Sequence, residues 1–337
     1  MTETAVGSLA PSAVDTSSGE LAPRLEQHRT ELTGYCYRML GSPFEAEDAV
    51  QETLLRAWRG FHRFEGRAGL RSWLYRIATN VCLDMLNGRQ RRARPMDLGP
   101  ASSADVTLKP PLPETAWIEP IPDDRAVQAG GDPADVAVAR ESVRLAFVAA
   151  LQHLPPRQRA VLILREVLRW KADEVAELLD STTASVNSAL QRARATIAAS
   201  DVNAPARFDA LDDAQRQLLA RYVDAFERYD LDSLTSLLHE DATQCMPPYD
   251  LWLRGQADIF KWWLGPGIGC RGSRLVATVA NGQPAFGQWK PSGPGGRHEP
   301  WSLQVLDVEG DRITGITFFL DTDRVFPLFG LPPHPGT

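Results

Sequence analysis

"LPPRQRAVLILREVLRWKADEVAELLDSTTASVNSALQRARATI", residues 154–197, decides the fold in the middle of this chain. The stretch predicts two short helices, 171–179 and 183–197, separated by the three residues "DST". On the second helix, Val186, Leu190, Ala193 and Ile197 recur at the spacing of one helical face. Two short helices joined by a tight turn form the helix-turn-helix pattern, whose second helix lies in the major groove of DNA.

The opposite face of the second helix carries side chains that suit base recognition. They are Asn187, Ser188, Gln191, Arg192 and Arg194. Asn and Gln bridge adenine edges, Arg bridges guanine, and Ser bonds bases or phosphates. The alternative is an ordinary helical hairpin with a solvated polar face. Such a face usually mixes charge signs, whereas residues 181–200 contain no acid.

A second stretch, "FEGRAGLRSWLYRIATNVCLDMLNGRQRRAR" at residues 64–94, combines aromatic and basic side chains. It predicts a helix over "SWLYRIATNVCLDML", capped by Ser72. Rings that stack on bases and arginines that follow phosphates are typical of single-strand binding. The candidates are Phe64, Arg71, Tyr75, Arg76, Arg89, Arg91 and Arg92. The alternative is that Phe64, Trp73 and Tyr75 are core residues.

The stretch "SPFEAEDAVQETLLRAWRGF", residues 42–61, has the opposite charge. A Ser cap, a Pro in the first turn and early acids indicate the start of a helix. Its exposed face should be acidic and should repel DNA. It carries Glu45, Glu47, Asp48 and Glu52, with Gln51 beside them. We therefore expect a protein partner there. A solvated helix start with favourable dipole placement is the alternative.

Composition limits the remaining possibilities. The net charge is −7, yet residues 20–96 hold thirteen Arg and Lys against nine Asp and Glu. Residues 201–337 are acidic, with twelve against eighteen. The four cysteines lack metal-ligand spacing, so we expect no disulfide framework, metal or cofactor. The first twenty residues lack a signal-peptide pattern, and no apolar run is long enough to span a bilayer, which predicts a cytoplasmic protein.

These motifs, in this order, resemble the extracytoplasmic-function (ECF) sigma factors of bacterial RNA polymerase. The matching elements are "AEDAVQETLLRAW", the stretch 64–94 and the stretch 154–197. The resemblance implies two all-α domains, one for the −10 promoter element and one for the −35 element. It also implies that Asp48, Gln51 and Glu52 contact the clamp helices of the largest polymerase subunit. Phe64 and Asn80 fall at positions implied in capture of a flipped base. A basic residue is frequent where Asn187 stands, which leaves the −35 sequence preference open.

The chain continues past the usual end of such factors. "LLARYVDAFERYDLDSLTSLLHEDATQCMPP" and the later strand-like runs resemble a SnoaL-like domain of the NTF2-like fold, an α+β cone. The whole arrangement resembles the actinobacterial SigG/SigJ type, in which this domain is thought to regulate the factor. Trp252, Phe260, Trp263 and Trp289 are candidates for a ligand pocket, with core packing as the alternative. His239, Asp241 and Asp321 are the acid–base candidates. Their alternatives are a helix-end turn for the first two and a helix cap for Asp321.

The sequence thus predicts a multidomain chain and a promoter-specificity subunit that is not an enzyme. The predicted segments are a disordered tail (1–19), a −10 domain (20–96), a Pro-rich acidic linker (97–131), a −35 domain (132–200), a short linker (201–213) and a SnoaL-like domain (214–330). The expected partners are core polymerase and promoter DNA, with a separate anti-sigma factor left open. We also expect the acidic last domain to contact the sigma domains or the linker. A helix-turn-helix regulator fused to a ligand-binding or enzymatic domain is the alternative function.

Overall fold

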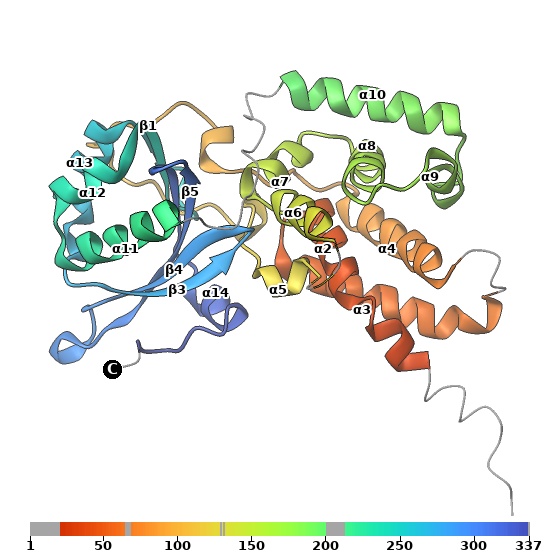
Figure 1. Ribbon diagram of the computed structural model, residues 1–337, viewed down its shortest axis with the longest axis horizontal. Helices are drawn as coiled ribbons and strands as arrows, with labels where there is room; N and C mark the ends of the chain where they lie inside the picture. Colours follow the sequence, from red (N-terminus) through yellow and green to blue (C-terminus); the bar gives the residue numbers. More distant parts are fainter. Residues whose placement is uncertain (1–20, 65–68, 129, 131, 200–212, 336–337) are drawn as a thin grey trace, which may run out of the picture.

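The computed structural model describes residues 21–64, 69–128, 130, 132–199 and 213–335. An all-helical part and a part built on a six-stranded sheet lie side by side (Figure 1). This order confirms the predicted fold class, with helical regions first and an α+β region last. The predicted disordered tail and nearly all of the short linker 201–213 lie outside the described residues.

The first helical region contains α2 (Arg29–Leu40), α3 (Pro43–Gly60), the turn η1 (Phe61–Arg63) and α4 (Leu70–Leu86). Ser42 caps α3 as predicted, because its hydroxyl accepts a hydrogen bond from the Glu45 amide at 3.4 Å. The predicted cap of α4 was wrong. Gly69 occupies the cap position with extended backbone angles, and Ser72 lies within the first turn. The helix begins earlier because Leu70 packs against the hydrophobic core.

The second helical region supplies the helix-turn-helix. It contains α6 (Pro133–Glu141), α7 (Leu145–Gln152), α8 (Pro156–Leu162), the π-helical turn η4 (Ile163–Val167), α9 (Ala172–Leu178) and α10 (Thr183–Ala199). Thr182 precedes α10, and its hydroxyl accepts a hydrogen bond from the Ser185 amide at 3.2 Å. Among the residues that the structure describes, none of the helices combines the length and apolar character needed to cross a bilayer.

The Pro-rich segment between these regions is packed along much of its length. It contains three short helical turns, η2 (Pro95–Asp97), η3 (Glu114–Ala116) and α5 (Asp123–Ala126). Its middle runs along the sheet part, where the Ser102 amide donates to the Trp252 carbonyl at 2.8 Å. Further on, Trp117, Ile118 and Ile121 are buried. The segment predicted as a linker therefore also contributes to the core.

The last part is a mixed sheet with helices. Its strands are β1 (Leu238–Cys245), β2 (Trp252–Arg254), β3 (Arg274–Ala280), β4 (Gln283–Lys290), β5 (Glu299–Glu309) and β6 (Arg312–Phe319). The strand order is β2-β1-β6-β5-β4-β3, and β1 and β6 are parallel. The helices are α11 (Asp213–Arg228), α12 (Leu231–Leu237), α13 (Gln256–Leu264) and α14 (Thr322–Leu328), with the turns η5 (Pro266–Cys270) and η6 (Pro294–Gly296).

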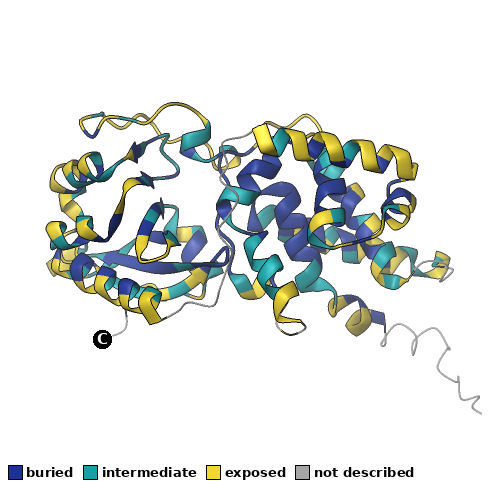
Figure 2. Ribbon diagram, turned by 45° about the horizontal axis from the view of Figure 1, so that its top comes forward, coloured by how far each residue is buried: buried dark blue, intermediate teal, exposed yellow. Residues whose placement is uncertain are grey.

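The two faces of the sheet belong to different hydrophobic clusters. On β5, Leu306 faces the cluster formed with α11, α12 and α13, whereas Leu303 and Val305 face the opposite cluster. This alternation follows from the two-residue period of a strand. The cluster that contains Leu303 and Val305 also contains Val325 of α14 and the cores of both helical regions. Buried residues accordingly run through the helices and along the strands (Figure 2).

Candidate DNA, polymerase and interdomain interfaces

All five side chains predicted to read the −35 element lie on one exposed face of α10. Val186, Leu190 and Ala193 are buried on the other face, where α10 packs against α8 and α9. The exposed residues are Asn187, Ser188, Gln191, Arg192 and Arg194. Arg194 forms an ion pair with Glu166 at 2.5 Å, and both side chains remain largely exposed. The helix itself contributes no acid to this polar face, which carries side chains of the kind that enter a major groove.

The aromatic residues of α4 are less available than the sequence predicted. Tyr75 is fully buried, and its ring lies 5.1 Å from that of Trp170 in the helix-turn-helix region. Its hydroxyl donates to Glu31 at 3.3 Å. The prediction of Tyr75 as a surface for base stacking therefore does not hold in this conformation. Tyr75 is instead a core residue, which was the alternative given for it in the sequence analysis.

Two arginines of α4 also contact the helix-turn-helix region, close to Tyr75. Arg71 pairs with Glu31 at 2.7 Å, and its guanidinium lies 5.4 Å from the centre of the Trp170 ring. Arg76 pairs with Asp180, in the turn before α10, at 2.6 Å. Both side chains keep more than two fifths of their surface exposed. The face of α4 predicted to melt DNA is thus turned toward the domain predicted to read the −35 element.

The arginines after α4 separate into two kinds. Arg89 and Arg91 are exposed, and Arg91 donates to the His153 ring at 2.7 Å. Arg92, also predicted to bind DNA, is buried and pairs with Glu45 at 3.0 Å and Glu119 at 3.4 Å. Its guanidinium is enclosed by protein and holds the linker against α3. The prediction for Arg92 is therefore corrected to a structural role.

The two residues implied in base capture remain accessible. Asn80 is exposed on α4. Phe64 is half-buried, with its ring 5.0 Å from Trp73 and 5.7 Å from Phe61. Residues 65–68, which follow Phe64 in the chain, lie outside the described residues.

The outer face of α3 is mixed in character. Asp48 and Gln51 are exposed, and the half-buried Glu52 pairs with Arg56 at 2.6 Å. Leu55 and Trp58 continue the same face, with 40% and 42% of their surface exposed. Acidic groups beside large exposed apolar side chains favour a protein partner over nucleic acid. The sequence analysis missed Leu55 and Trp58, although their helical spacing from Asp48 could have revealed them.

The tip of the β3–β4 hairpin joins three segments of the chain. Asn281 at this tip is fully buried, and its amide nitrogen donates to the Tyr37 hydroxyl and to the Val143 carbonyl, both at 2.7 Å. Its amide oxygen accepts from the Ile121 backbone at 3.0 Å. One side chain therefore contacts the first helical region, the linker and the segment before α7.

The backbone at this tip is equally constrained. Asn281 and Gly282 have φ of 57° and 68°, a conformation that favours Asn and Gly. A Cβ on Gly282 would lie 2.7 Å from the Arg140 carbonyl oxygen. The Gly282 amide donates to Asp123 at 2.7 Å. The short turn thus allows the hairpin to approach the helical part closely.

A second interdomain contact centres on α14. Arg324 forms ion pairs with Glu114 and, at 3.2 Å, with Glu119 of the linker. Its guanidinium also lies 4.0 Å from the centre of the Phe44 ring at the start of α3. The predicted contact between the last domain and the sigma domains or linker is therefore present in the structure.

The acid–base candidates of the last domain stand apart. His239 and Asp241 lie in β1, so the alternative of a helix-end turn does not hold for them, and Asp241 pairs with Arg254 at 3.5 Å. The strand begins directly after α12 because Leu238 pairs with Ile313 of β6. Asp321 lies at the cap position of α14, but its side chain makes no capping hydrogen bond and instead pairs with Arg324 at 3.6 Å. The structure does not bring these three groups into one site.

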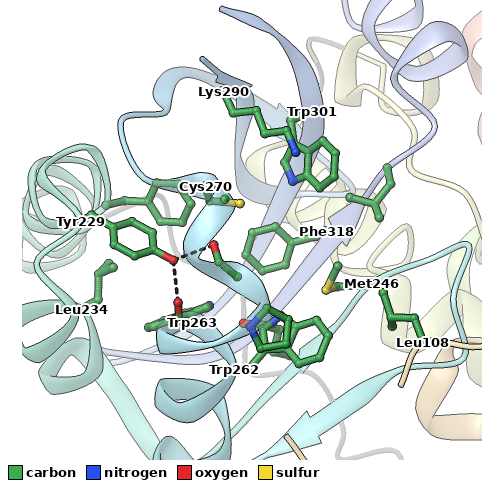
Figure 3. A pocket seen from close by; sticks show the side chains of 16 residues that line it. Leu108, Tyr229, Leu234, Met246, Trp262, Trp263, Cys270, Lys290, Trp301 and Phe318 are labelled. Carbon is green, nitrogen blue, oxygen red and sulfur yellow. Dashed lines mark hydrogen bonds between the residues drawn. The ribbon is translucent and has the colours of Figure 1, made fainter. Parts of the chain in front are cut away.

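A cavity of about 200 Å³ lies between the sheet and the helices α11–α13 (Figure 3). Of the four predicted pocket residues, only Trp263 lines it. Trp289 lies on the other face, against Phe326. The Trp252 indole donates to the Gly99 carbonyl at 2.9 Å, and Phe260 is partly exposed on α13. For these three, the sequence did not reveal which way the side chain points.

Three parts of the chain match known protein families. Residues 25–92 match Sigma-70 region 2, residues 144–197 match Sigma-70 region 4, and residues 219–316 match a SnoaL-like domain. The ECF RNA polymerase sigma factor SigG of Mycobacterium tuberculosis is 46% identical over 321 residues, which cover 94% of this chain and 85% of that protein. SigJ of the same species is 31% identical over 310 residues, covering 89% and 91%.

The fold has a counterpart among solved structures. The crystal structure of Mycobacterium tuberculosis SigJ covers 92% of this chain and all of that chain, with a TM-score of 0.60 and 22% identity. These findings favour a sigma factor over a helix-turn-helix regulator of another kind. The chain belongs to the ECF sigma factors, which bind RNA polymerase and direct the initiation of transcription, in the form that carries a SnoaL-like domain.

Proposed function

We propose that the described conformation is a closed resting form of this sigma factor, and that the SnoaL-like domain holds it closed. The observation that carries the proposal is Asn281, which bonds the first helical region, the linker and the segment before α7 at once. In this proposal the factor acts on promoters in the cytoplasm, with α4 at the −10 element and α10 at the −35 element.

Promoter geometry requires the closed form to open. The names of the two elements place them roughly 25 base pairs apart, which is about 85 Å of B-form DNA at ~3.4 Å per base pair. Here the guanidinium of Arg76 on α4 and the carboxylate of Asp180, just before α10, form an ion pair with an N–O distance of 2.6 Å. Tyr75 is also buried against Trp170. One duplex therefore cannot engage both regions until they separate.

Polymerase binding does not need the same rearrangement. Asp48, Gln51, Leu55 and Trp58 are already exposed on α3 in the closed form. Core polymerase could therefore dock on α3 first, and opening would follow on the polymerase surface. We assign the SnoaL-like domain a binding role without catalysis, because its acid–base candidates do not converge on its cavity.

The test is run-off transcription with purified core polymerase on selected promoters. Asn281→Gly suits the positive φ of this position and removes all the side-chain hydrogen bonds. It removes the bonds that the Val143 carbonyl and the Ile121 amide make to this side chain in the closed form, whereas the Tyr37 hydroxyl keeps its bond to the Glu119 carbonyl. We expect promoter-specific output to rise about tenfold, the effect of a loss of ~1.4 kcal/mol from the closed form.

The matched control is Asp311→Gly in the β5–β6 turn, where the side chain is 81% exposed. This variant should leave the output unchanged. Output from Asn281→Gly that equals or falls below that of the parent chain, with unchanged secondary structure by circular dichroism, would contradict the proposed restraint.

A further inference from the structure

The cavity of the SnoaL-like domain is built to hold an apolar molecule. Its wall is almost entirely carbon, and the large side chains that converge on it are Phe226, Trp262, Trp263, Trp301 and Phe318. Its volume is about 200 Å³. Apolar cavities of about 150 Å³ bind benzene. This cavity therefore suits a molecule of one or two fused rings.

One polar group in the wall lacks a partner. Gln244 of β1 lines the cavity, and only 2% of its surface is exposed. Its side-chain oxygen has no hydrogen-bond partner among the described residues. A buried acceptor without a donor is costly, and native proteins seldom retain one without a reason. A ligand that donates a hydrogen bond would satisfy it.

Three other polar groups around the cavity have contacts of their own or stay uncharged. The Tyr229 hydroxyl donates to the carbonyls of Trp263 and Gly267, at 2.8 and 2.7 Å. The Lys290 ammonium lies 3.1 Å from the centre of the Trp301 ring. Burial raises the pKa of the Cys270 thiol, which keeps that group uncharged at neutral pH. The Gln244 oxygen is thus the acceptor in this wall that has no partner among the described residues.

The linker between the two sigma domains completes the cavity wall. Leu108 lines it, in the view of Figure 3 on the side of Met246. The neighbouring linker residues are fastened to the domain, because Asp105 pairs with Lys261 and Lys109 pairs with Asp250 at 2.8 Å. A molecule in the cavity would therefore contact the chain segment that connects the −10 and −35 domains.

We propose that this cavity is a regulatory site for a small, neutral, ring-containing molecule that donates a hydrogen bond to Gln244 and packs against Leu108. Such a molecule fastens the linker to the SnoaL-like domain and stabilises the closed form. The binding part stands on the cavity alone, whereas the regulatory part rests on the proposed closed resting form.

The binding test uses the full chain and two probes that differ in one hydroxyl, 2-naphthol and naphthalene. Tryptophan fluorescence reports their binding, because Trp262, Trp263 and Trp301 line the cavity. We expect 2-naphthol to bind about tenfold more tightly than naphthalene, the factor that one hydrogen bond to a buried acceptor supplies. Gln244→Leu should remove this difference, since leucine fills similar space without an acceptor.

The control for this substitution is Gln217→Leu, at an exposed position on α11. It should leave the tenfold preference intact. Gln244→Leu should also melt at or above the temperature of the parent chain, because it removes an unsatisfied buried acceptor. Absence of saturable 2-naphthol binding, or an unchanged preference in Gln244→Leu, would overturn the site.

A separate variant tests the contact between the linker and the ligand. Leu108→Ala removes apolar contact with the ligand and should weaken 2-naphthol binding about fivefold. 2-Naphthol should lower run-off transcription by the parent chain, and Gln244→Leu should need about tenfold more 2-naphthol for the same reduction. Equal output with and without 2-naphthol would overturn the regulatory part. The closed resting form is judged separately, by the output of Asn281→Gly without any probe.

Discussion

The side-chain amide of Asn281 donates a hydrogen bond to the hydroxyl of Tyr37 across 2.7 Å, between residues 244 positions apart in the chain. The Tyr37 hydroxyl in turn donates to the Glu119 carbonyl at 2.7 Å. Both side chains are fully buried. This short relay joins the SnoaL-like domain, helix α2 of the first helical region and the linker, so its loss should weaken the contacts among all three.

Tyr37→Phe tests the relay directly. The substitution keeps the ring and leaves the Asn281 amide and the Glu119 carbonyl without their shared partner. We expect the free energy of unfolding to fall by about 1–3 kcal/mol in urea denaturation. The double variant with Asn281→Gly should lose less than the sum of the single variants, because both remove the same bond. Strict additivity would show that the two residues act independently.

Arg92 and Arg91 should respond in opposite ways to removal. Arg92→Ala removes the buried cation that bridges Glu45 and Glu119, which keep only the more exposed Arg89 and Arg324, so we expect a loss of about 1–3 kcal/mol in stability. Arg91→Ala at an exposed position should change stability by less than about 0.5 kcal/mol and instead weaken promoter binding by the holoenzyme. Thermal melts and filter binding measure the two effects. Equal destabilisation by both would contradict the assignment of Arg92 to structure.

Asp123 predicts a pH dependence of stability. Burial raises the pKa of this carboxyl, although the Gly282 amide and Arg140 oppose the shift. Between the ordinary value of 3.8 and the raised pKa, the folded chain binds more protons than the unfolded one, so stability from Asp123 falls as pH rises through this window. Asp123→Asn keeps an oxygen acceptor for Gly282 and removes the ionisation.

The measurement is the melting temperature of both chains from pH 4 to pH 7. The melting temperature of the parent chain, relative to that of Asp123→Asn, should decline with rising pH and then level off. Asp124→Asn at the exposed neighbouring position serves as the control and should follow the parent chain. A constant difference between the parent chain and Asp123→Asn across this range would refute the prediction.

The outer face of α3 should bind polymerase through apolar as well as acidic side chains. Leu55→Ala removes an exposed apolar group from that face, and we expect the Kd for core polymerase to rise about tenfold. Leu264→Ala on α13 is the matched control, because its side chain is 59% exposed on another helix. Surface plasmon resonance with immobilised core polymerase compares them. An equal Kd for the two variants would remove Leu55 from the interface.

The helical regions were predictable because their signals are local. The face of α10 follows from the spacing of Val186, Leu190 and Ala193, and a helix fixes which side chains share a face within a few residues. The cap of α3 at Ser42 has the same local origin. Tyr75 and Arg92 were not predictable, since their environments come from Trp170 and Glu119, distant in the chain.

The sequence by itself determined the order of the regions, the helix-turn-helix and the polar face of α10, because hydrophobic periodicity and capping act over one or two turns. Only the tertiary structure decided that α4 lies against the helix-turn-helix region and that Asn281 links three segments. It also placed Trp263 and Gln244, but not Trp289, on the cavity. These contacts depend on how whole elements pack and on the register of β4, and a one-residue change in register reverses the face of every side chain in a strand.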